Sequence, residues 1–187
     1  YYLKGNYIQY MDRQIKAASD NDMIVTLILV LWGNSMPGDS PNVHIRHPDY
    51  PPQPPHGIVA AVNTTNSIGT NYWKAACEFL AERYTRNDQL YGRAVNYIIG
   101  NEVNSQGVWN DMGNKTMEQY MEQHARTFRI AHTAIKKKYQ YARVHLSLDH
   151  LWNKAHDQTQ PLRYYKGKTV MDDFNYIIKQ GGNIDWN

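Results

Sequence analysis

Residues 94–102 read AVNYIIGNE, a short apolar run followed directly by a glycine, an amide and a carboxylic acid. The run is rich in β-branched and aromatic residues and is bounded by Gly100, so it predicts a buried strand. Helical patterns lie on both sides of it, which favours a parallel strand. In parallel α/β proteins the chemistry collects at the carboxyl ends of the strands. Glu102 follows this end, and a buried carboxylate is costly unless it is hydrogen-bonded or used, so Glu102 is a candidate functional residue.

Outward from this stretch, the chain alternates between helical and strand patterns. Apolar side chains three and four positions apart predict helices over 6–20, 71–86 and 169–180, and another from a capping box at 116–119 to a lysine run at 136–138. Strands are predicted over 23–31, which we expect to be buried on both faces, and over 94–99, 143–148 and 184–186. This order predicts an α/β fold in one domain spanning 1–187, with about four parallel strands joined by right-handed crossover helices.

The composition of the chain argues against several classes of function. The net charge of +3 is small and spread out, so no nucleic-acid partner is expected, and no apolar run is long enough for a membrane span. Cys77 is the only cysteine, which excludes an internal disulfide. The absence of a Gly-rich loop between strand and helix argues against a nucleotide cofactor, and we expect no cofactor. The 15 tyrosines and 5 tryptophans suit sugar rings and equally suit a tyrosine-rich packing style.

Polar and aromatic side chains follow each of the first three strands, where they could share one cleft. The candidate site residues are Trp32, Asn34, Asn101, Glu102, Asn104, Trp109, Asp149, His150 and Trp152. Packing is the simpler role for Trp32 or Trp152 alone, and a turn cap explains Asp149 at least as well as catalysis does. For His150, a satisfied hydrogen bond is the default interpretation.

The connection over residues 33–69 is long, without periodicity and rich in Pro, Gly, Asn and His, which is typical of a functional loop. His44, His47 and His56 raise the possibility of a cation site. Their spacing lacks a helical frame and a cysteine or acidic partner, so we expect no metal there.

The Gly100-Asn101-Glu102 motif after an apolar strand resembles the fourth-strand signature of the retaining (β/α)8-barrel glycoside hydrolases, the superfamily called clan A. The resemblance implies that Glu102 is the general acid/base and that Asn101 hydrogen-bonds the 2-hydroxyl of the sugar. It also implies a partial TIM barrel running from the third strand to the sixth. The chain is similar to a little-characterised bacterial branch of the superfamily, which implies a secreted or extracellular parent acting on a polysaccharide or oligosaccharide.

The chain departs from this pattern in one respect. A retaining enzyme needs a second carboxylate about 5–5.5 Å from the first, which this family supplies from strand seven, whereas the sequence stops at strand six. Asp149 and Asp185 are the remaining strand-associated acids, and neither matches the nucleophile position. We therefore expect a fragment that is inactive alone. The alternative is a non-catalytic carbohydrate-binding or scaffold domain. The unpaired edges of such a slice predict self-association, or partial closure of the slice by the long connection over 33–69.

Overall fold

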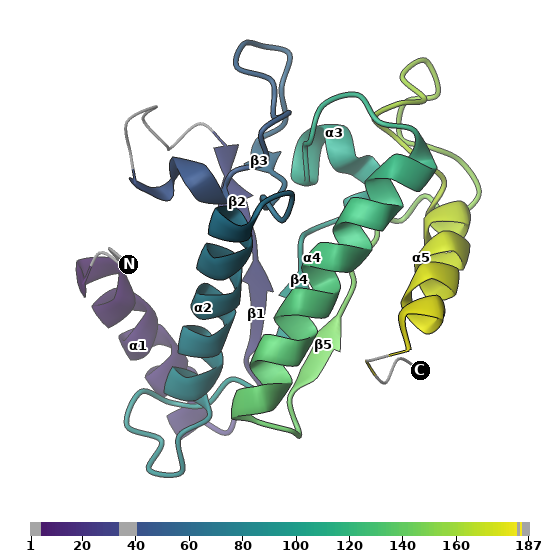
Figure 1. Ribbon diagram of the computed structural model, residues 1–187. Helices are drawn as coiled ribbons and strands as arrows, with labels where there is room; N and C mark the ends of the chain where they lie inside the picture. The colour runs from purple at the N-terminus through teal and green to yellow at the C-terminus, as the bar shows by residue number, and fades with distance from the viewer. Residues whose placement is uncertain (1–4, 34–40, 183, 185–187) are drawn as a thin grey trace.

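Three parallel strands form the centre of the fold (Figure 1). The computed structural model describes residues 5–33, 41–182 and 184. Strand β4 (Asn96–Ile99) lies between β1 (Thr26–Leu29) and β5 (Arg143–His145), and it pairs with both in parallel. The α/β class with a parallel sheet is therefore confirmed.

Four long helices accompany the sheet: α1 (Gly5–Asp20), α2 (Ser67–Tyr84), α4 (Met117–Lys138) and α5 (Gly167–Gly181). Each lies within a few residues of its predicted range. Helix α4 begins with the predicted capping box, in which Thr116 Oγ1 accepts from the Gln119 amide and the Gln119 side chain accepts from the Thr116 amide. Helix α2 starts at Asn66, whose side chain accepts a hydrogen bond from the Gly69 amide.

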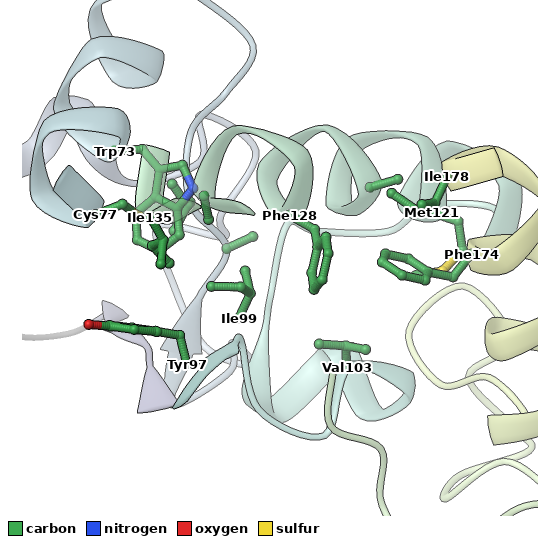
Figure 2. Close-up of a cluster of buried hydrophobic side chains, with 14 of the residues drawn as sticks. Trp73, Cys77, Tyr97, Ile99, Val103, Met121, Phe128, Ile135, Phe174 and Ile178 are labelled. Atoms are coloured by element: carbon green, nitrogen blue, oxygen red, sulfur yellow. The ribbon is translucent and has the colours of Figure 1, made fainter. Parts of the chain in front are cut away.

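The main core fills the space between one face of the sheet and the helices α2, α4 and α5. Figure 2 shows Tyr97 and Ile99 of β4 below the side chains of these helices. The buried helix residues include Trp73, Cys77, Phe128, Ile135, Phe174 and Ile178. Cys77 is fully buried against this core, and its burial raises the pKa of its thiol. The apolar residues that recur three and four positions apart, from which the helices are predicted, thus form the buried face of each helix.

The other face of the sheet is open. Ile28, Ile98 and His145 are aligned across the three strands on this face, and 51% of Ile28 is exposed. Thr26 and Arg143 lie two residues before Ile28 and His145, so they point to the same face, and both are exposed as well. The prediction that the first strand is buried on both faces is wrong, because no described element covers its second face.

The sheet is also shorter than the apolar pattern predicts. The apolar run over 23–31 contains β1 and then the start of β2 (Leu31–Trp32), which pairs antiparallel with β3 (Val59–Ala60) as a separate small sheet. A short 3-10 helix (Pro41–Ile45) lies within the long connection, and η3 (Val103–Ser105) and α3 (Gln106–Trp109) follow β4. The predicted last strand falls mostly on 185–187, outside the described residues, and Ile184 lies in a bend. In the described ranges, no helix has the length and apolarity to span a bilayer.

Candidate functional site

The carboxyl ends of the three parallel strands are joined by hydrogen bonds. The Gly100 amide donates to Leu29 O at 3.1 Å, which joins the ends of β4 and β1. On the other side, the Glu102 amide donates to Ser147 Oγ at 2.9 Å, and the Val103 amide donates to Ser147 O at 3.0 Å. The segments that follow β4 and β5 therefore meet at one edge of the sheet, as the strand order predicts.

Glu102 has a strained backbone. Its φ of 40° and ψ of 51° lie in the left-handed region, which costs a residue with a Cβ atom roughly 1–2 kcal/mol. Gly100, two residues earlier, also has a positive φ of 77°, and a Cβ atom there would lie 2.9 Å from Val103 Cγ1. Together the two residues turn the chain sharply out of β4 and into η3. The hydrogen bonds that the Glu102 and Val103 amides donate to Ser147 hold this conformation.

The side chains of Asn101 and Glu102 are partly exposed at this edge. Neither side chain makes a hydrogen bond or an ion pair with a described residue. An accessible carboxylate beside an accessible amide offers a bound molecule one group that exchanges protons and one that both donates and accepts hydrogen bonds.

Asp149, in contrast, is engaged by its neighbours. One carboxylate oxygen accepts from Ser105 Oγ at 2.5 Å, and the other accepts from the Leu151 amide at 2.7 Å. Burial acts to raise the pKa of Asp149, but these hydrogen bonds outweigh it and hold the pKa below its ordinary value. The alternative that Asp149 caps a turn is confirmed. Asn104 is fully buried, and its side chain accepts from the Asp149 amide at 2.8 Å, so it joins the two segments beneath the site.

The candidate tryptophans come from three separate segments, namely β2, the end of α3 and the connection after β5, and Figure 1 shows the labelled elements β2, α3 and β5. Trp32 on β2 is 55% exposed, Trp152 in the connection after β5 is 48% exposed, and Trp109 at the end of α3 is partly buried. His150 is exposed. Asn34 lies outside the described residues. The structure thus brings two of the polar candidates, Asn104 and Asp149, into direct contact.

One family model covers the whole chain, residues 1–187, and its description is a family of unknown function, DUF5722. The chain belongs to the DUF5722 family. Neither the curated proteins nor the solved structures gave a match. Any activity assigned to this DUF5722 chain therefore rests on the geometry of its own residues.

Sequence reasoning missed a buried ion pair behind the site of the DUF5722 chain. Asp111 is fully buried and pairs with Arg163 at 2.8 Å. The same carboxylate accepts from the amides of Gly57 at 2.6 Å and Gly113 at 2.9 Å. These bonds hold the long connection, the segment after α3 and the segment before α5 together. The Asp-x-Gly spacing of 111–113 was a turn signal that pointed to part of this network.

A second buried polar group lies between Gly100 and α4. Asn110 Nδ2 donates to Tyr120 Oη at 2.8 Å and lies 3.1 Å from His124 Nδ1, which assigns the His124 ring proton to Nε2. Nε2 is buried without a partner and lies at a cavity of about 10 Å³, room for one water. Burial lowers the pKa of His124 to about 4.

The loop histidines are engaged with neighbouring side chains. His47 Nε2 lies 2.5 Å from Gln123 Oε1, and His56 Nδ1 lies 3.0 Å from the Tyr50 hydroxyl. The His44 ring stacks on Tyr72. Over the ranges described, no three His, Cys, Asp or Glu side chains are grouped so as to hold a metal ion.

Proposed function

We propose that the carboxyl edge of the sheet is a carbohydrate site, in which Glu102 is the general acid/base of a retaining glycoside hydrolase. The observation that carries the proposal is a glutamate held in the left-handed region at the end of the central strand, with its carboxylate unpaired. Backbone strain of this kind collects at functional sites, where surrounding contacts maintain it. In this role Glu102 protonates the glycosidic oxygen as the bond breaks and then deprotonates a water. Asn101 binds the 2-hydroxyl of the same sugar.

The open face of the sheet supports the further proposal that DUF5722 forms part of a (β/α)8 barrel. Doubly wound sheets carry helices on both faces, whereas a barrel carries all its helices on the outside and packs the inner face with side chains from all its strands. The described sheet has helices on one face only, and Ile28 and His145 are exposed on the other. In a closed barrel this face would be the packed interior.

The proposed mechanism needs a nucleophile, and we propose that it lies outside the described residues. Asp149 is the other acid that directly follows a described strand, and both of its carboxylate oxygens are occupied by Ser105 and the Leu151 amide. These hydrogen bonds fix the orientation of the Asp149 carboxylate and hold its pKa below the ordinary value, which makes it a weaker nucleophile. The 187-residue chain by itself is expected to hydrolyse no glycoside.

The test uses the natural gene product that contains these residues, assayed for release of reducing ends from a panel of polysaccharides. Glu102→Gln is expected to lower the rate by at least about 100-fold, since a positioned general acid contributes about 10²–10⁴-fold. Glu122→Gln, a change at an exposed glutamate on α4, is the matched control and should leave the rate unchanged. Hydrolysis at the unmodified rate in Glu102→Gln would refute the assignment.

A second candidate function is carbohydrate binding without hydrolysis. It is favoured by the engagement of Asp149, which leaves Glu102 as the unpaired acid among those that directly follow the described strands. Under this alternative, Glu102→Ala retains oligosaccharide affinity in calorimetry, and no preparation of the gene product releases reducing ends.

A further inference from the structure

A pocket of about 440 Å³ opens in the connection between β5 and α5. Its lining includes Asn153, Lys154, Gln158, Tyr164 and Lys166. The lining begins one residue after the exposed Trp152 and ends at Lys166, the N-cap of α5, and Tyr165 within this stretch is hydrogen-bonded to Asn104. The size of the pocket is within the range of pockets that hold small ligands.

The aromatic wall of this pocket is fixed to the sheet edge that carries Glu102. A Cβ atom on Gly107 would lie 3.1 Å from Tyr164 Cζ, so the Tyr164 ring rests directly on α3. The next residue, Tyr165, donates its amide to Asn104 O at 2.8 Å. The preceding residue, Arg163, is held by the buried Asp111. These contacts preorganise Tyr164 beside the strand ends.

Two lysines at this pocket lack an acidic partner. Lys154 and Lys166 are exposed, and neither makes an ion pair with a described residue. Asp157 is the acid between these lysines in the sequence, and hydrogen bonds from Thr159 and Gln160 hold its pKa below the ordinary value, so it contributes one negative charge against the two lysines. Lys115, Lys138 and Lys168 are each paired with a carboxylate, whereas Lys74 and Lys179 pair with no described acid; the pocket differs in placing two such lysines in one lining. The pocket therefore presents two positive charges and amide side chains beside the Tyr164 ring, whose centroid also lies 5.5 Å from that of the His156 ring.

We propose that this pocket is a subsite for an anionic sugar residue, so that the substrate of the site is an acidic polysaccharide. Lys154 and Lys166 bind the carboxylate of a uronic acid or a sulfate ester, and the Tyr164 ring packs against the sugar face. Asn153 and Gln158 bind its hydroxyl groups. The inference rests on the proposed function, because the ligand is a further unit of the polysaccharide bound at Glu102.

The test measures binding of three oligosaccharide probes to the 187-residue chain by calorimetry: an oligogalacturonate, a sulfated galactan oligosaccharide and a neutral galactan oligosaccharide. The variant K154A/K166A removes both charges of the pocket. The matched control K74A/K179A removes two exposed lysines on α2 and α5. We expect the pocket variant to bind the anionic probe about 3–10-fold more weakly, the control to stay within about 2-fold, and added salt to reduce the difference. The anionic probe that responds identifies the carboxylate or the sulfate ester as the recognised group.

The variant K154R/K166R retains both charges and is expected to keep most of the affinity for the anionic probe. An unchanged melting temperature in each variant shows that a loss of affinity does not come from misfolding. Equal losses in the pocket variant and the control would overturn the subsite, because the attraction would then come from general charge. Binding of the neutral probe alone would overturn the subsite and leave the carbohydrate site intact. The two proposals can fail separately. If K154A/K166A weakens binding but Glu102→Gln leaves the hydrolysis rate of the gene product unchanged, the subsite is supported and the proposed catalysis is refuted.

Discussion

At Glu102 the backbone and the side chain are both unusual, and the two observations have different origins. The side chain lies at the carboxyl end of β4, a position that the apolar run over 94–99 predicts from sequence. The left-handed backbone depends on Ser147, which comes from another strand and is brought beside Glu102 by the parallel pairing of β4 with β5. The sequence therefore identifies Glu102 as a candidate but does not predict its strained backbone. It likewise names Asp149 as a candidate, but it does not reveal the hydrogen bond from Ser105, which lies 44 residues away in the sequence.

Replacing Glu102 with Gly tests the strain directly. The Gly variant should be more stable than Glu102→Ala by about 0.5–1 kcal/mol in urea unfolding, because glycine adopts a φ of 40° without a Cβ clash. At Glu122, inside α4, the same pair of substitutions should give the opposite order by a similar amount. A less stable Gly variant at position 102 would contradict the strain.

His124 should make stability depend on pH. Its folded pKa of about 4 lies below the ordinary value of 6.5, so the unfolded chain takes up the proton first as the pH falls. The contribution is complete above about pH 6.5 and is lost toward pH 4, by about 1.4 kcal/mol per pH unit. Urea unfolding at pH 7, 5.5 and 4.5 should show this slope in the original chain and a reduced slope in His124→Gln. Exposed His156→Gln should keep the original slope; identical slopes in all three proteins would argue against the assignment.

Among the elements, the long helices follow the sequence closely and the short strands do not. The helices α1, α2, α4 and α5 each bury one face in a core, so their periodicity is visible in the chain itself. The run over 23–31 reads as one strand because nearly every residue in it is apolar. The parallel strand ends before Leu31 because Leu31 and Trp32 pair with β3 in the second, antiparallel sheet. Such pairing between distant residues leaves no local signal.

The ion pair between Asp111 and Arg163 joins segments that the sheet itself does not hold. Asp111→Ala should lower the free energy of unfolding by about 3–5 kcal/mol, because it leaves a largely buried guanidinium and two buried amides without their partner. Asp172→Ala breaks an exposed pair with Lys168 on α5 and should cost at most about 1 kcal/mol. Urea unfolding compares the two, and similar losses would mean that Asp111 has no special structural role.

On the scale of the whole molecule, the open face of the sheet is its main unsatisfied surface. The sequence predicts the alternation of helices and strands, which fixes the parallel sheet. It does not reveal that helices cover one face only, because exposed residues such as Ile24 and Ile28 are as apolar as the buried ones. The face carries Ile28 and Ile98 among the polar side chains of Thr26, Asn96, Arg143 and His145, and exposed isoleucines on a face that no described element covers can form an interaction site.

The 187-residue chain is therefore expected to self-associate through this face. Light scattering should give a mass that rises with concentration, and Ile28→Lys should lower that mass because a charge on this face disfavours its burial. Ile68→Lys, at an exposed position on α2, is the control. A constant monomeric mass for the original chain at about 100 μM, roughly the range where weak contacts become populated, would count against the prediction.

The burial of Cys77 has a practical consequence for studying this protein. It is the only cysteine in the chain, it lies on α2 against the sheet, and its raised pKa keeps the thiol protonated. A thiol reagent can modify it only after the packing between α2 and the sheet opens. The rate of Cys77 modification, measured without any engineered probe, therefore reports how often the core beneath the Glu102 edge opens under native conditions.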